Sequence, residues 1–153
     1  MTYGDSSIEV LLVEDNPGDV ELTRIAFREA RVPNPLRVVT DGVQAMAYLR
    51  QECPFEQATR PGLILLDLNL PRMDGREVLQ TVKSDPELRR IPVCIMSSSH
   101  QDCDVSKSYD LHANSYICKP VTIAALIETV AQLRDYWLRM VLLPSATRST
   151  SGQ

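Results

Sequence analysis

The chain has 153 residues, of which 44% are hydrophobic and 24% charged, and its net charge at pH 7 is −4. This length suits one domain with a buried core, whereas the acidic balance argues against nucleic-acid binding, which requires a basic face. No apolar run approaches the length of a membrane span, and residues 1–7 lack the pattern of a signal peptide, so we expect a cytoplasmic protein without membrane contact.

The first half of the chain predicts two strand–helix pairs followed by a loop. Ile8–Val13 is rich in β-forming residues and predicts the first strand. Asn16 and Pro17 suit the cap and first position of a helix, which apolar residues at helical spacing continue until Pro33 stops it. The next predicted segments are a strand at Leu36–Val39, a helix capped by Asp41 and running to about Gln51, and a surface loop at Cys53–Gly62.

The second half begins with an apolar run from Leu63 that ends on the carboxylate of Asp67, which predicts a strand buried on both faces. The segments predicted after it are a helix from the cap Asp74 to about Lys83, a strand at Ile91–Met96, a weakly anchored helix at Gln101–His112, a strand at Ser115–Ile117 and a long amphipathic helix from Ile123 to Val141. Five alternations of strand and helix predict a parallel sheet with helices on both faces. We expect one domain over residues 8–143, with flexible termini at 1–7 and 145–153.

The four cysteines predict no metal site. They form no C-x-x-C pair, and the two histidines stand at no ligand spacing from them. Because the protein is expected in the cytoplasm, we predict reduced thiols in preference to zinc ligands or disulfides.

Polar side chains follow several of the predicted strands at the point where each ends. Glu14 and Asp15 follow the first strand, Asp67 closes the third, Ser97 follows the fourth and Lys119 comes just after the fifth. Ligands of open parallel sheets bind beyond the carboxyl ends of the strands. We therefore expect these five residues to converge at one edge of the sheet.

A cluster of this kind calls for a positive centre. Two carboxylates about 4 Å apart repel by roughly 4 kcal/mol at an effective dielectric constant of about 20. Mg²⁺ suits a site with few carboxylates, and a metal, a lysine and a hydroxyl together suit a transferring phosphoryl group. Asp67 would then be the nucleophile and become an aspartyl phosphate. The alternative is that each residue is a separate cap or turn residue.

Four segments together resemble the receiver domain of two-component response regulators: Val13–Asn16, Leu66–Gly75, Ser97 and Lys119–Pro120. The resemblance extends over about Ile8–Leu142 and implies a doubly wound α/β fold, with five parallel strands in the flavodoxin-like order 2-1-3-4-5. It also implies a signalling protein that accepts a phosphoryl group, and not a conventional enzyme.

The resemblance implies a role for each residue at the acidic edge. Asp67 would accept phosphate from a sensor histidine kinase. Asp15 and Asp67 would bind Mg²⁺ through their side chains and Asn69 through its backbone carbonyl, while Glu14 would act through a metal-bound water.

Three further implications concern the neighbouring strands. Ser97 would move toward the phosphoryl group and Lys119 would hold it, while Tyr116 would rotate inward on activation. The Lys119–Pro120 peptide bond would be cis, which is otherwise a minority state. We expect the output surface to include Gln101–His112, Tyr116 and the last helix.

Within the family, the chain is most similar to stand-alone regulators that pair with bacterial phytochromes. Asn16–Glu21, the loop at Cys53–Gly62 and Trp137–Leu138 carry this narrower resemblance. Only a short polar tail follows Pro144, so we expect no effector domain and an output through protein contact.

The end of the last predicted helix is apolar on nearly every side, which indicates a partner surface. We expect a homodimer formed through a face that contains Tyr109, Trp137, Met140 and Val141. The alternative is that this helix end folds back on its own domain.

Three other functions compete with this interpretation. A magnesium-dependent phosphatase also forms an aspartyl phosphate, but its nucleophile is usually followed two residues later by a second aspartate, and Asn69 stands there. A nucleotide- or flavin-binding domain would need a glycine-rich loop, and Val13–Val20 contains only Gly18. A receiver used purely as a binding module would not need to retain the nucleophile, the acidic metal ligand and the lysine.

Overall fold

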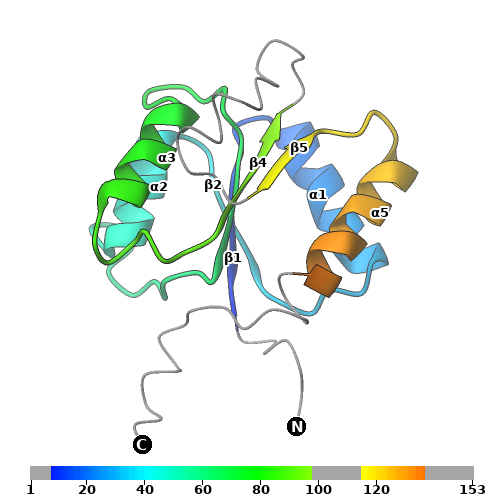
Figure 1. Ribbon diagram of the computed structural model, residues 1–153, viewed down its shortest axis with the longest axis horizontal. Coiled ribbons are helices and arrows are strands. Elements are labelled where there is room, and N and C mark those ends of the chain that lie inside the picture. The colour runs from blue at the N-terminus through cyan, green and yellow to red at the C-terminus, as the bar shows by residue number, and fades with distance from the viewer. Residues whose placement is uncertain (1–7, 98–114, 137–153) are drawn as a thin grey trace, which may run out of the picture.

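The computed structural model describes residues 8–97 and 115–136. The described chain forms one sheet of five parallel strands in the order β2-β1-β3-β4-β5. Figure 1 shows helices α2 and α3 on one side of the sheet and α1 and α5 on the other. The predicted fold class, strand order and placement of helices on both faces are confirmed.

The strands are β1 (Val10–Val13), β2 (Leu36–Val39), β3 (Leu63–Leu66), β4 (Val93–Ser97) and β5 (Ser115–Cys118). The helices are α1 (Pro17–Glu29), α2 (Gly42–Arg50), α3 (Gly75–Ser84) and α5 (Ile123–Leu133). None of the helices in these two described stretches is both long and apolar enough to cross a membrane. The helix predicted at 101–112 and the end of the last predicted helix lie outside the described residues.

The two faces of the sheet bury two separate apolar clusters. Leu11, Ile64 and Ile95 pack on the face covered by α2 and α3, whereas Leu12 and Leu65 pack on the face covered by α1 and α5. Successive residues of a strand point to opposite faces, so a strand covered on both sides must be apolar at every position. This explains why β1 and β3 are uninterrupted apolar runs.

The predicted helix caps fix where three helices begin. The Asn16 side chain accepts a hydrogen bond from the Asp19 amide (3.1 Å), and the Asp41 side chain accepts one from the Gln44 amide (2.7 Å). Asp74 forms the predicted capping box at the start of α3. Each cap satisfies amide groups that a helix leaves unpaired at its first turn.

Two expectations about local structure were wrong in detail. The fourth strand begins at Val93 instead of Ile91, since Pro92 lacks the amide hydrogen that a strand ladder uses. Cys53 and Cys94 are free as expected, but Cys118 is disulfide-bonded. Disulfide formation depends on the spatial approach of two side chains, which spacing along the sequence does not reveal.

Gly75 allows α3 to begin directly against the segment that follows β3. A Cβ at Gly75 would lie 2.2 Å from the Asp67 carbonyl oxygen and 2.6 Å from the Leu68 Cα. The Gly75 amide also donates a hydrogen bond to the Leu68 carbonyl (3.0 Å). This close backbone approach fixes the position of Asp67 at the end of its strand.

We predict that Gly75→Ala destabilises the fold by roughly 1–3 kcal/mol, because the added methyl group has only backbone to displace. Urea denaturation would measure the change. Gln80→Ala, at an exposed position of the same helix, is the control and should stay within about 0.5 kcal/mol of the parent. A Gly75→Ala protein as stable as the parent would show that the close contact is not a constraint.

Candidate functional site

The carboxyl ends of β1 and β3 bring three carboxylates together. Glu14, Asp15 and Asp67 each have an oxygen within 4.8 Å of the other two. Glu14 and Asp67 are buried, with 2% and 8% of their surface exposed, and Asp15 is exposed. Buried carboxylates at this spacing repel one another strongly unless a cation compensates them. An all-oxygen donor set that is open on one side fits Mg²⁺ or a similar hard divalent cation.

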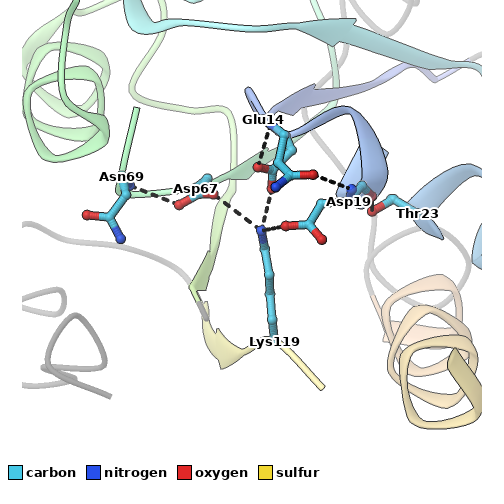
Figure 2. A network of polar contacts seen from close by, with 7 residues as sticks. Glu14, Asp19, Thr23, Asp67, Asn69 and Lys119 are labelled. Atoms are coloured by element: carbon cyan, nitrogen blue, oxygen red, sulfur yellow. Dashed lines mark hydrogen bonds and ion pairs between the residues drawn. The ribbon is translucent and has the colours of Figure 1, made fainter. Parts of the chain in front are cut away.

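Lys119 supplies a fixed positive charge to the same site, as Figure 2 shows. Its Nζ donates hydrogen bonds to Glu14 Oε1, to Asp19 Oδ2 (3.0 Å) and to Asp67 Oδ2 (3.3 Å). An ammonium group has three donors, so Lys119 directs all of them to carboxylates. The predicted convergence of Lys119 with the acidic residues is therefore observed.

Backbone amides orient the two buried carboxylates. Asp67 Oδ1 accepts a hydrogen bond from the Asn69 amide (2.9 Å), and Glu14 Oε2 accepts one from the Asn16 amide (3.2 Å). Each carboxylate thus has one oxygen held by its own loop and the other directed at Lys119. Asn69 therefore contacts Asp67 through its backbone amide, whereas the group predicted to bind the metal is its backbone carbonyl.

Burial and pairing shift the pKa values of Glu14 and Lys119. Burial raises the pKa of Glu14 to about 7, because its hydrogen bond with Lys119 offsets the loss of solvation only in part and the Asp67 charge opposes ionisation. Burial alone would lower the pKa of Lys119, but its hydrogen bond to Glu14 and the charges of Asp67 and Glu14 raise it above its usual range. The ammonium therefore stays charged while Glu14 titrates near neutrality.

The other predicted site residues are only partly placed. Ser97 is the last residue of β4 and pairs in register with Cys118, next to Lys119, and Tyr116 pairs with Ile95. The description of Ser97 and Tyr116 covers the backbone alone. All four residues of the expected partner face lie outside the described residues: Tyr109, Trp137, Met140 and Val141.

The Lys119–Pro120 peptide bond does not have the implied cis geometry. Within the described ranges the cis bond is Cys53–Pro54, so Lys119–Pro120 is trans and that expectation was wrong. The trans form is the lower-energy state of an X–Pro bond by about 0.5–1 kcal/mol.

Asp19 is a site residue that the sequence analysis missed. It lies in the first turn of α1, three residues after the cap Asn16. A signal was present, because an acidic residue in the first turn of a helix that directly follows a site strand faces the same edge of the sheet. In the sequence, the segment Asn16–Glu21 indicates a helix cap and the narrower family resemblance, and neither of these assigns Asp19 to the site.

Comparison with known proteins identifies the family. The family model described as "Response regulator receiver domain" matches residues 10–131, and the chain belongs to that family. Response regulator Rcp1 of Synechocystis sp. is 43% identical over 137 residues, which are 90% of this chain and 93% of that protein. As a receiver domain protein, the chain belongs to the signalling proteins and is not a conventional enzyme.

Solved structures support the narrower resemblance. The phosphorylated cyanobacterial phytochrome response regulator RcpA has a TM-score of 0.84 and 48% identity, covering 91% of this chain and 99% of that one. The Mn²⁺-bound form of Rcp1 has a TM-score of 0.82 and 42% identity, and the match covers 90% of this chain and 99% of that one. Relatives of this chain thus include phytochrome response regulators, as predicted.

The raised pKa of Glu14 predicts a pH-dependent loss of stability in metal-free protein. The folded state keeps a proton on Glu14 up to about pH 7, whereas the unfolded chain loses it near the ordinary value of 4.5. The contribution of Glu14 is therefore fully present below pH 4.5 and is lost as the pH rises to about 7. Glu14→Gln removes this loss, so between these pH values the variant should gain roughly 1–3 kcal/mol relative to the parent.

Urea denaturation in EDTA at about pH 5 and about pH 8 would measure this gain. Glu21→Gln, on an exposed position of α1, controls for the loss of one negative charge. A Glu14→Gln difference that is the same at both pH values would contradict the assignment.

Proposed function

We propose that the protein is a response regulator that accepts a phosphoryl group on Asp67 from a sensor histidine kinase. The observation that carries the proposal is the position of Asp67, a buried carboxylate between two other carboxylates and the Lys119 ammonium. That the related RcpA was obtained in a phosphorylated form, and Rcp1 with Mn²⁺, supports the same chemistry here.

In the proposed reaction an Asp67 carboxylate oxygen attacks the phosphorus of the donor. The new P–O bond forms while the P–N bond to the kinase histidine breaks, and the histidine nitrogen keeps the bonding electron pair. Asp15, Asp67 and the Asn69 carbonyl would hold Mg²⁺ directly and Glu14 would hold it through a water, and the ion would supply positive charge to the phosphoryl oxygens. The Asn69 amide contact holds Asp67 in a fixed orientation for attack.

Lys119 and Ser97 would stabilise the product. An aspartyl phosphate no longer offers the Asp67 carboxylate to Lys119 but carries phosphoryl oxygens that accept hydrogen bonds strongly. The Lys119 donor now directed at Asp67 would turn to one of these oxygens. The Ser97 hydroxyl, at the end of the adjacent strand, would contact another.

The phosphoryl group would switch the surface beside β5. Movement of Ser97 would shift the segment 101–112 that follows it, and Tyr116 would turn inward, changing a face that also includes α5. A free-energy change of about 1–3 kcal/mol is enough to shift a weakly held element. We propose a bacterial phytochrome as the kinase, by analogy with RcpA, a cyanobacterial phytochrome response regulator. The cytoplasmic location remains part of this proposal.

Phosphorylation by acetyl phosphate tests the proposal. With Mg²⁺, the parent protein should gain one phosphoryl group by intact-protein mass spectrometry, and Asp67→Asn should gain none because it lacks the nucleophile. Asp85→Asn, at the far end of α3, is the control and should be phosphorylated like the parent. Turnover of external phosphoesters, without a retained phosphoryl group, would instead favour the phosphatase alternative.

We also propose a homodimer through the apolar end of the last helix, which includes Trp137, Met140 and Val141. Residues 137–143 are apolar at nearly every position. A helix can turn only one side to its own core, so apolar residues on its other sides favour a partner surface.

Trp137→Glu should weaken the dimer at least tenfold in sedimentation, because it places a charge in an apolar interface. Gln132→Glu, at an exposed position of α5, is the charge-matched control. A Trp137→Glu dimer as tight as the parent dimer would show that this surface is not the interface.

A further inference from the structure

The Lys119 ammonium has one carboxylate partner for which the proposed phosphorylation chemistry gives no role. Glu14 and Asp67 belong to the acidic cluster, but Asp19 does not. Asp19 comes from α1 and its Oδ2 lies 3.0 Å from Lys119 Nζ, nearer than the 3.3 Å from Asp67 Oδ2 to the same nitrogen. Its side chain is 37% exposed, at the rim of the site.

The first turn of α1 holds Asp19 in place independently of the acidic cluster. The Asp19 amide donates to Asn16 Oδ1 (3.1 Å), and the Asp19 carbonyl accepts from the Thr23 hydroxyl (2.8 Å). The carboxylate also lies at the positive end of the helix dipole, which favours a negative charge there. These contacts hold the backbone of Asp19, so α1 places its carboxylate beside Lys119 without help from the acidic cluster.

The partners of Lys119 differ in what phosphorylation does to them. Asp67 becomes an acyl phosphate, a mixed anhydride that no longer carries a free carboxylate, and Glu14 belongs to the cluster that would take up the cation. Asp19 takes part in neither change, so its contact with Lys119 can persist throughout the cycle. From this geometry we infer that Asp19 is a positioning residue, which holds the Lys119 ammonium beside Asp67 so that it meets the incoming phosphoryl oxygens. This inference rests on the proposed phosphorylation of Asp67.

Loss of the Asp19 charge could change the rate of phosphorylation in two opposite directions. The direction of the change therefore tests the inference. Removing a negative charge near an anionic phosphodonor would by itself speed phosphorylation. If Asp19 positions Lys119, its removal instead frees the ammonium to pair more closely with Glu14 and Asp67, which shields the nucleophile and removes its preorganisation. The positioning role therefore predicts a slower reaction, and simple electrostatic repulsion a faster one.

Asp19→Asn tests the inference in the full chain. At saturating Mg²⁺ and with acetyl phosphate as the donor, we expect its rate constant for phosphorylation to fall roughly tenfold, with only the small fall in melting temperature that loss of a charge at a helix start gives. Glu21→Gln removes a charge from the same helix outside the site and should react like the parent. An unchanged or faster Asp19→Asn reaction would overturn the inference.

A second measurement tests the contact between Asp19 and Lys119 directly and requires neither Mg²⁺ nor phosphorylation. In Mg²⁺-free, ¹⁵N-labelled protein, NMR would record the ammonium signal of Lys119, assigned by its absence in Lys119→Ala. Asp19→Asn should shift or broaden this signal and Glu21→Gln should not, whereas an unmoved signal in Asp19→Asn would also overturn the inference. A parent protein that acetyl phosphate fails to label would contradict the proposed function itself, which separates the two failures.

Discussion

The concentration of negative charge at one end of the sheet is the constraint on which the rest of the structure depends. Glu14 and Asp67 are buried beside each other, and a pair of buried like charges is stable only with a cation close by. Lys119 meets part of that requirement by directing all three of its donors at carboxylates. A site that is still short of positive charge is suited to take up a divalent cation.

The fold delivers these charges to one place through simple rules. Parallel strands end at the same edge, and the apolar runs of β1 and β3 anchor that edge to two packed layers of helices. The caps Asn16 and Asp41 begin α1 and α2 shortly after β1 and β2. In the loops after β1 and β3, the amides of Asn16 and Asn69 are directed at the carboxylates. Gly75 brings α3 against the backbone of Asp67, which supports that residue at the end of its strand.

The parts of this structure that could be predicted from sequence are those that local patterns determine. Neighbouring residues determine the apolar strand runs, caps such as Asn16 and Asp74, and the polar residues at strand ends. These features were predicted correctly. The first-turn position of Asp19 places it at the edge of the sheet, but its contact with Lys119 joins residues far apart in the chain, so the sequence does not name the partner. The Cys118 disulfide and the trans Lys119–Pro120 bond depend likewise on tertiary context. The roles of Ser97 and Tyr116 stay predictions, because they concern side-chain movements.

The most direct measurement of the central claim is a crystal structure of the protein with Mg²⁺ and beryllofluoride, which mimics a phosphoryl group on aspartate. This account predicts the cation between Asp15 and Asp67, the beryllofluoride on Asp67, and Lys119 Nζ bonded to a fluorine while it keeps its contact with Asp19. A structure with the cation outside this pocket, or with Lys119 turned away from Asp67, would contradict it.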